Sequence, residues 1–257
     1  MEMDRRGFLR VAGLGALGAG LAGGRLLAPG EAFASEEAGA ARTGTRWAMV
    51  VDLRKPCPDG CAVCTAACHA KHNVPALAEK NHEIKWIWET TWEHAFVEPA
   101  AQVEPPGQQE RPVLVLCNHC ENPPCVRVCP TKATFKRPDG IVAMDFHRCI
   151  GCRFCMAGCP YGSRSFNWVD PRTGLPGGKA TNPEFPTRMR GVVEKCNFCT
   201  ELLGKQSPWC VQACPEGILT FGDINEQGSA VRALLTEHHT VRRKTHLGTD
   251  PQVYYIV

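Results

Sequence analysis

The chain has 257 residues, and its 29 Lys and Arg against 26 Asp and Glu give a formal net charge of +3 at pH 7. This length is enough for one large domain or two small ones, and so weak a charge gives no case for nucleic-acid binding. The unusual feature of the composition is its 16 cysteines.

The first 34 residues have the features of an export signal. An arginine pair, Arg5 and Arg6, precedes a run rich in Gly and Ala from Val11 to Gly24. That run is too short and too weakly apolar to span a bilayer, and the cleavage motif Ala32-Phe33-Ala34 follows it. The pattern predicts a twin-arginine signal over 1–34 and export of the folded protein to the periplasm.

The cysteines fall into four groups, and none lies outside them. Group one is Cys57, Cys61, Cys64 and Cys68; group two is Cys117, Cys120, Cys125 and Cys129; group three is Cys149, Cys152, Cys155 and Cys159; group four is Cys196, Cys199, Cys210 and Cys214. Group three, followed by Pro160, has the spacing C-x2-C-x2-C-x3-C-P, by which bacterial ferredoxins hold [4Fe–4S] clusters. The sequence therefore predicts four [4Fe–4S] clusters.

The spacing also predicts which cysteines share a cluster. Three cysteines on a tight loop direct their thiolates at one cluster, whereas the fourth begins a helical turn and ligates the neighbouring cluster. We therefore expect crossed ligand sets. These are Cys57, Cys61 and Cys64 with Cys214; Cys196, Cys199 and Cys210 with Cys68; Cys117, Cys120 and Cys125 with Cys159; and Cys149, Cys152 and Cys155 with Cys129.

Three groups depart from the regular spacing. Group one is C-x3-C-x2-C-x3-C and has no proline after Cys68, while groups two and four carry longer insertions before their third cysteines. Loop insertions accommodate these differences. The first cluster is the one that the pattern defines least.

Two other uses of cysteine remain open at this point. Sixteen is an even number, and an exported protein can form disulfides, although a disulfide framework does not require a C-x2-C step in nearly every group. Paired C-x2-C units also bind structural zinc, although these runs supply too many thiolates at too short a spacing. A zinc-stabilised binding module without redox activity is the alternative of a different class.

Short apolar runs on either side of the cysteine groups predict strands. They lie at 47–51, 113–116, 133–136, 141–145, 163–169, 191–193 and 218–221. The sequence Arg137-Pro138-Asp139-Gly140 between two of them predicts a tight turn, because Pro presets φ and Gly accepts a positive φ. Groups two and three are therefore joined by a β-hairpin.

This connection predicts the division into domains. Groups two and three form one ferredoxin-like domain over 112–170, and groups one and four form the other from 46–70 and 191–225. Residues 71–111 and 171–190 are insertions, and 226–257 form a C-terminal helix and tail. The predicted fold is α+β: two interleaved bacterial-ferredoxin-like domains with short strands and helices.

The insertions and the tail carry further signals. We expect Trp86, Trp88 and Trp92 to pack locally rather than to form a partner surface. The segment Ser229–His238 predicts an amphipathic helix, and Gln252–Val257 has the composition of a strand. That strand either completes the protein's own sheet or adds to the sheet of a partner.

The sequence offers no catalytic residues. It contains no Ser/His/Asp set, phosphate-binding loop or dinucleotide fingerprint. The histidines near the cysteine groups, which are His69, His72, His119 and His147, suit hydrogen bonding to sulfur rather than ligation. We therefore expect an electron relay with no substrate site of its own.

Several segments resemble the electron-transfer subunits of the molybdopterin oxidoreductase family. The resemblance covers residues 46–225, and the C-terminal end shares it. It is carried by Trp47–Leu53, His72–Pro75, Ile84–Trp88, Cys117–Cys125, Asn182–Pro186 and Pro251–Val257. Within the family, it is closest to the periplasmic iron–sulfur subunits of transmembrane redox complexes in dissimilatory sulfur metabolism.

This resemblance implies the partners. Such subunits pass single electrons between an integral membrane quinone-interacting subunit and a periplasmic multihaem cytochrome, and they contact the membrane only through a partner. The second interpretation is an electron-transfer subunit of a periplasmic molybdopterin oxidoreductase.

Overall fold

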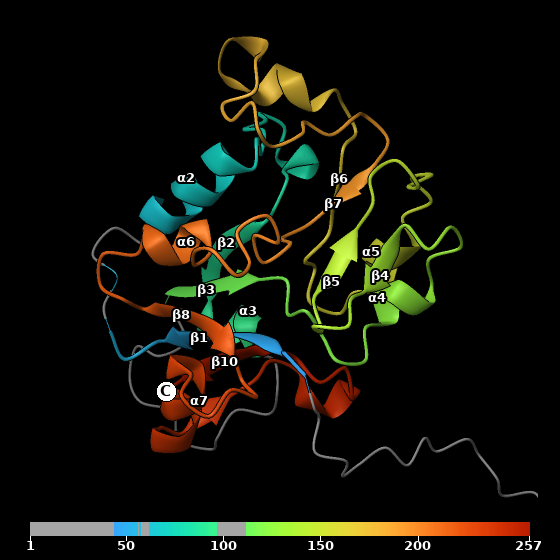
Figure 1. Ribbon diagram of the computed structural model, residues 1–257. Helices are drawn as coiled ribbons and strands as arrows, with labels where there is room; N and C mark the ends of the chain where they lie inside the picture. Colours follow the sequence, from blue (N-terminus) through green and yellow to red (C-terminus); the bar gives the residue numbers. More distant parts are fainter. Residues whose placement is uncertain (1–43, 56, 58–61, 97–111) are drawn as a thin grey trace, which may run out of the picture. The chain divides into compact units, whose positions relative to one another are not determined.

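The computed structural model describes residues 44–55, 57, 62–96 and 112–257. The predicted signal over 1–34 and the predicted ligand Cys61 lie outside the described residues. In the described part, strands and helices are short, as expected for an α+β protein built around loops (Figure 1).

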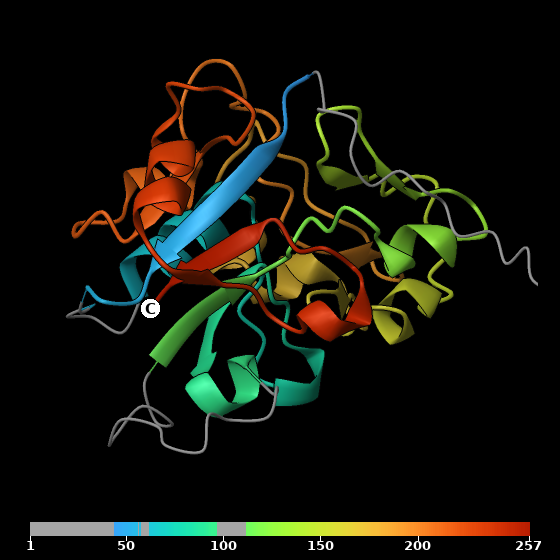
Figure 2. The same cartoon turned by 90° about the horizontal axis from the view of Figure 1, so that it is seen from below.

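A four-stranded sheet joins segments from both ends of the described residues (Figure 2). Its strand order is β8-β1-β10-β9, with bounds Leu219–Asp223, Trp47–Asp52, Val253–Ile256 and Thr240–Val241. Strand β1 pairs antiparallel with β8 and parallel with β10, so that Val50 lies opposite both Thr220 and Tyr254. The C-terminal strand therefore completes the protein's own sheet, which decides between the two roles that the sequence left open.

The two faces of β1 pack against different parts of the protein. Met49 and Val51 point into the main apolar core, while Ala48 and Val50 point toward α7, Ala230–Glu237. Successive side chains of a strand alternate between faces, and here both faces are covered. Helix α7 confirms the predicted amphipathic helix, and the Ser229 hydroxyl caps it by accepting a hydrogen bond from the amide of Arg232.

The first insertion supplies β2, Ile87–Thr91, a strand that the sequence did not predict. Strand β2 pairs antiparallel with β3, Pro112–Leu116. Trp86, immediately before β2, is 1% exposed, and its ring stacks on His72. The prediction that these tryptophans pack locally is confirmed, since Trp88 and Trp92 also lie against the main core. The same insertion contains η1, Lys80–His82, and α3, Trp92–Ala95.

The predicted hairpin between groups two and three is confirmed. Strands β4, Thr134–Lys136, and β5, Val142–Met144, pair antiparallel with Lys136 opposite Val142. Gly140 has a φ of 82°, and a side chain there would overlap the guanidinium of the buried Arg46. Helices α4, Pro124–Arg127, and α5, Phe154–Ala157, pack against each other beside this hairpin (Figure 1).

The remaining elements bring the segments of groups one and four together. Helix α2, Ala62–Lys71, lies beside α6, Trp209–Gln212 (Figure 1). A two-stranded sheet, β6 at Ser165–Phe166 and β7 at Val193–Glu194, follows group three and precedes group four. The short 3-10 helices are η2 at Pro171–Gly174, η3 at Pro176–Gly178 and η4 at Thr245–Leu247. Within the described ranges, no helix is long and apolar enough to cross a membrane.

The position of β10 inside the sheet predicts the effect of truncation. Deleting residues 252–257 removes a strand whose Val253, Tyr255 and Ile256 are fully buried, and leaves β1 without one of its two neighbours. We expect the truncated protein to lose its soluble folded form, measured by yield and by thermal melting followed by circular dichroism. Deleting Val257 alone, which is 40% exposed, should leave the melting temperature unchanged. A truncated protein that melts like the full-length protein would contradict the structural role of the tail.

Candidate iron–sulfur cluster sites

The cysteine loops have a backbone conformation that suits an anionic ligand. Positive φ angles occur at His119 (41°) in group two, Gly151 (70°) and Arg153 (65°) in group three, and Phe198 (56°) and Cys199 (50°) in group four. Left-handed residues in a loop can turn backbone N–H groups toward an anion, as in many iron–sulfur sites. In group four, the amide of Phe198 donates to the sulfur of Cys196 at 3.5 Å, which suits a negatively charged ligand.

Short helices fix the cysteines that follow these loops. Helices α4, α5 and α6 carry Cys125, Cys155 and Cys210, each of which is buried. Helix α2 carries Cys64 and Cys68, four residues apart and therefore on one face of the helix. Both side chains point inward and are 4% exposed.

One cavity is lined by the four cysteines of a single predicted ligand set. Cys117, Cys120, Cys125 and Cys159 all face it, together with Arg164. Burial, and then the neighbouring Cys117 thiol, raises the pKa of Cys120 to about 12 and also raises the pKa of Cys159. The fourth cysteine of group three thus reaches the thiols of group two.

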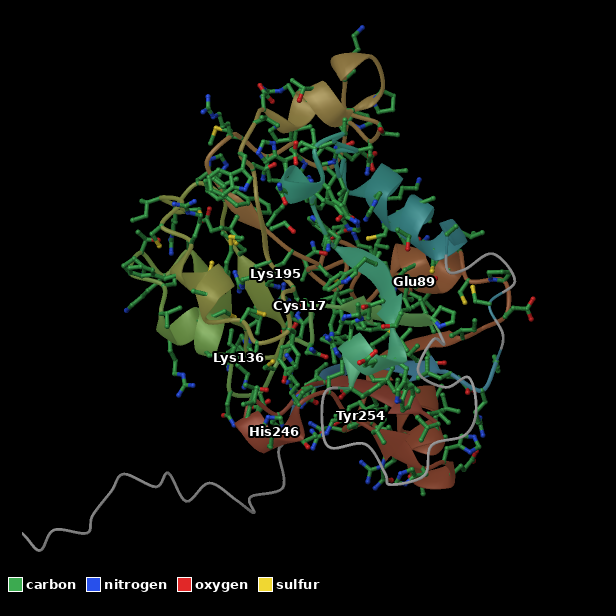
Figure 3. The ribbon with its side chains drawn as sticks, turned by 180° about the vertical axis from the view of Figure 1, so that it is seen from behind. Glu89, Cys117, Lys136, Lys195, His246 and Tyr254 are labelled. Atoms are coloured by element: carbon green, nitrogen blue, oxygen red, sulfur yellow. The ribbon has the colours of Figure 1, made fainter. Side chains whose placement is uncertain are left out.

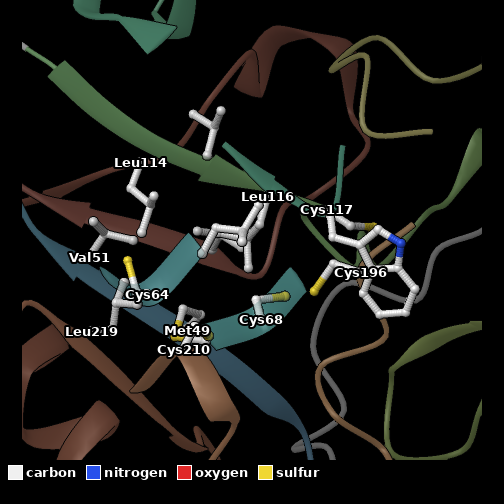
Figure 4. Close-up of a cluster of buried hydrophobic side chains, with 14 of the residues drawn as sticks. Met49, Val51, Cys64, Cys68, Leu114, Leu116, Cys117, Cys196, Cys210 and Leu219 are labelled. Atoms are coloured by element: carbon white, nitrogen blue, oxygen red, sulfur yellow. The ribbon is translucent and has the colours of Figure 1, made fainter. Parts of the chain in front are cut away.

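A second predicted set converges in the main core. Burial, followed by the thiols of Cys196, Cys210 and Cys199, raises the pKa of Cys68 well above its ordinary range. Figure 4 shows the sulfurs of Cys68 and Cys196 pointing toward each other. Burial, followed by the nearby Cys117 thiol, raises the pKa of Cys196 to about 12. The structure therefore brings α2 of group one to the thiols of group four.

His72 lies against this second set. Its Nδ1 lies 2.9 Å from the carbonyl oxygen of Cys68, and its Nε2 lies 2.9 Å from a carboxylate oxygen of Glu201. The same two nitrogens lie 3.6 Å from the sulfur of Cys68 and 3.7 Å from the sulfur of Cys199. His72, Cys199 and Glu201 are close enough together to hold a metal ion, but Cys199 is also a member of the predicted ligand set of Cys196, Cys210 and Cys68. The geometry suits a histidine beside the sulfurs rather than a separate metal site.

The third and fourth sets are less enclosed. Burial raises the pKa of Cys155, which is 6% exposed, whereas Cys149 and Cys152 are half-buried. For Cys129, burial alone would raise the pKa, but hydrogen bonds from the backbone of Thr134 and the Thr131 hydroxyl lower it overall.

In the remaining set, Cys61 lies outside the described residues. The nearby Cys64 thiol contributes to raising the pKa of both Cys68 and Cys210, after the larger effect of burial. The amide of Ile218 donates to the sulfur of Cys214 at 3.2 Å.

The sets follow one another in a row. Cys125 and Cys155 pack in one apolar cluster, and Cys117, Cys196, Cys210 and Cys64 pack in the main core. In agreement with this packing, and after the larger effect of burial, Cys125 raises the pKa of Cys155, Cys117 raises that of Cys196, and Cys64 raises that of Cys210. Each predicted set thus lies next to the following one. The two ends of the row are the set of Cys149, Cys152 and Cys155, and the set of Cys57 and Cys64.

The thiols fit [4Fe–4S] clusters rather than a disulfide framework. No disulfide forms among the cysteines of groups two, three and four. Thiols that converge in buried sites are soft ligands, which iron–sulfur clusters select. Because a metal ligand must be a thiolate, cluster binding would displace the protons that burial otherwise retains on these thiols.

Comparison with known proteins identifies the kind of domain that this chain contains. Residues 113–173 and 148–218 each match a family model described as a 4Fe-4S dicluster domain. The chain is 40% identical to the "Hdr-like menaquinol oxidoreductase iron-sulfur subunit 1" of Archaeoglobus fulgidus, over 98% of this chain and 97% of that protein.

Two further relatives are also subunits of oxidoreductases. The chain is 37% identical to the iron-sulfur cluster-binding subunit of menaquinone reductase from Nitratidesulfovibrio vulgaris, over 82% of this chain and 88% of that protein. It is 33% identical to the B subunit of tetrathionate reductase from Salmonella typhimurium, over 100% of this chain and 89% of that protein.

The protein belongs to the family of iron–sulfur subunits of membrane-associated oxidoreductases of the molybdopterin type. The two dicluster domains of this iron–sulfur subunit hold four [4Fe–4S] clusters, which confirms the number predicted from the cysteine groups. It is an electron-transfer subunit, and the zinc-stabilised module is wrong.

Sequence reasoning missed the charged residues around the thiols. Arg164 lines the first cavity, and the carboxylate of Glu194 accepts hydrogen bonds from Trp86 at 2.7 Å and from Asn167 at 2.7 Å while pairing with Arg188. Glu194 lies in β7, and Arg164 and Arg188 lie in irregular segments, where charge normally indicates exposure. Only the spacing of Arg164 five residues after Cys159 could have marked it as close to a cluster loop.

The cofactor content predicts a chemical composition. Four cubes of four iron and four sulfide require about sixteen iron and about sixteen acid-labile sulfide per chain. Anaerobically purified protein should give these values by elemental and sulfide analysis. Prolonged treatment with an iron chelator and oxidant should remove the brown colour. Stoichiometric zinc with little iron would contradict this composition.

Proposed function

We propose that this chain is a periplasmic iron–sulfur subunit of the DsrO type. It relays single electrons through four [4Fe–4S] clusters between an integral membrane quinone-interacting subunit and a periplasmic multihaem cytochrome, in dissimilatory sulfur metabolism. The observation that carries the proposal is the row of four thiol sets with two ends. A row of this kind suits transfer between two partners rather than catalysis at one site.

The relatives support the quinone side of this role. The names of two of them include menaquinol oxidoreductase and menaquinone reductase. The described residues include no helix long enough to reach a quinone pool inside the bilayer. We therefore assign quinone contact to a membrane partner on which this subunit docks.

A second candidate rests on other relatives. The B components of tetrathionate reductase and of polysulfide reductase are each 33% identical to this chain. In this interpretation, the subunit exchanges electrons with a molybdopterin catalytic subunit instead of a cytochrome. The row of clusters would serve either partner, so the identity of the partner distinguishes the two roles.

Export before docking follows from the same proposal. Arg5 and Arg6 belong to a twin-arginine signal over 1–34, and this route carries folded proteins. Clusters are assembled in the cytoplasm, where iron and sulfide are supplied. The subunit would therefore cross the membrane with its clusters already bound.

Purification of the native complex tests the function. Extraction of membranes with a mild detergent should yield the subunit together with an integral membrane protein and a multihaem cytochrome. A reduced quinone analogue should then bleach the visible absorbance of the clusters and reduce the haem. A molybdopterin subunit in place of the cytochrome would favour the second candidate, and a subunit with no membrane partner would contradict both.

A matched control uses the signal. The double variant Arg5→Lys/Arg6→Lys should remain in the cytoplasm with its iron bound and should not associate with the periplasmic cytochrome.

We also propose the crossed ligand sets, with groups one and four in one two-cluster domain and groups two and three in the other. The domain of groups two and three is called the central domain because of its place in the sequence. In it, Cys120→Ser and Cys159→Ser should alter the same electron paramagnetic resonance signal of the reduced protein. Cys152→Ser and Cys129→Ser should alter a second signal. If Cys129→Ser and Cys120→Ser alter the same signal instead, each group holds its own cluster and the crossed assignment is wrong.

A further inference from the structure

Three buried cations have no carboxylate partner among the described residues. They are Arg164, Lys195 and Arg243, with exposed fractions of 5%, 2% and 4%. Burying an unpaired charge costs far more free energy than burying a paired one. The buried Arg188 shows the usual solution, since it pairs with Glu194 at 2.5 Å and both side chains are fully buried. The three cations must therefore be compensated by groups other than carboxylates.

Lys195 and Arg243 are satisfied mainly by carbonyl groups. The amine of Lys195, a residue labelled in Figure 3, donates to the carbonyls of Val142 and Cys196. Arg243 donates from Nε to the carbonyl of Ala95 at 2.9 Å. Carbonyl dipoles offset part of the cost of burial in both cases.

Arg164 differs because it reaches thiols from two cysteine groups. Its side chain lines the cavity of Cys117, Cys120, Cys125 and Cys159. A guanidinium nitrogen also lies 3.7 Å from the sulfur of Met144, which packs with Cys125 and Cys155 in one apolar cluster, and Arg164 opposes the rise that burial causes in the pKa of Cys155. One nitrogen donates to the Thr134 hydroxyl at 2.7 Å, which fixes the orientation of the guanidinium.

The two cysteines belong to different proposed ligand sets. Cys125 belongs with Cys117, Cys120 and Cys159, and Cys155 belongs with Cys149 and Cys152. A site of four thiolates with an oxidised cluster carries a charge of roughly −2, and reduction adds one more negative charge. A buried cation next to both sites therefore stabilises the reduced form of each more than the oxidised form.

We propose that Arg164 is a counter-ion shared by the two clusters of the central domain, and that its charge raises the reduction potentials of both. This inference rests on the proposed ligand assignment, and it deepens the proposed relay by naming a residue that sets the relative potentials along it. Arg164 acts through the ligands and is a positioning residue rather than a ligand. The Thr134 hydrogen bond holds it between the two sites.

Redox titration of the isolated cluster-loaded protein tests this role. The four cluster signals are followed by electron paramagnetic resonance, and the Cys120→Ser and Cys152→Ser variants assign the two central ones. In Arg164→Met and Arg164→Gln, both central midpoint potentials should shift to more negative values, while the other two stay unchanged. Arg164→Lys keeps the charge and should keep both central potentials close to wild type.

A surface arginine provides the matched control. Arg172 is exposed and lies in the second insertion, outside the cysteine loops, where its guanidinium pairs with Asp170 at 2.9 Å. Arg172→Gln removes the same charge where water and salt screen it. All four midpoint potentials should therefore remain unchanged.

Each outcome decides the proposal. Unchanged central potentials in Arg164→Met and Arg164→Gln, or a shift of one cluster alone, would overturn the shared role. If both neutral variants lose iron while Arg164→Lys keeps it, the charge itself holds the cluster pair, which supports the proposal. If Arg164→Lys also loses iron, the role of Arg164 is packing and the proposal fails. Because no partner is present, a wrong choice of partner would leave these results unaffected.

Discussion

The burial of thiolate ligands is the constraint on which the rest of this structure depends. Cys64, Cys68, Cys117, Cys196 and Cys210 lie in the main apolar core among valine and leucine side chains. An interior of that kind opposes charge, and burial accordingly raises the pKa of several of these thiols. Backbone amides of the loops donate to some of the sulfurs, as Phe198 does to Cys196 and Ile218 to Cys214, and the proposed counter-ion Arg164 would offset further negative charge of bound clusters. Local backbone geometry and the placement of charged residues thus both reduce the cost of burying negative charge.

The pairing of segments far apart in the sequence follows from this requirement. Thiols of groups one and four meet, and accordingly α2 lies beside α6 and β1 pairs with β8. Strand β10 then joins β1 from the other side and ties the C-terminal end into the same sheet. The long-range pairings fix the separation of the thiol sets more rigidly than loops could. A relay benefits from such rigidity because electron transfer depends on the spacing of the centres, which a protein supplies by holding its cofactors in place.

The two insertions form a buried polar network next to one of the sets. Arg188 of the second insertion donates to the carbonyls of His72 and Asn73, and Asn73 donates to the carbonyl of Phe185 at 2.6 Å. Trp86 of the first insertion stacks on His72 and donates to Glu194. Because Arg188 and Glu194 pair with each other, the insertions enclose the sulfurs of Cys68 and Cys199 without leaving either of these charges unpaired. The insertions therefore shield these sulfurs and hold His72 in its orientation beside them.

The sequence by itself determined the local features of this protein. The spacing of the cysteines predicted four clusters, Pro138 and Gly140 predicted the hairpin, and Ser229 marked the start of α7, because each feature depends on residues close together in the chain. Tertiary structure alone decided the rest. It placed β10 inside the protein's own sheet, paired β3 with an unpredicted strand, and brought Arg164 to sulfurs of two groups. These features depend on contacts between distant segments, whose burial and charge balance no local pattern records.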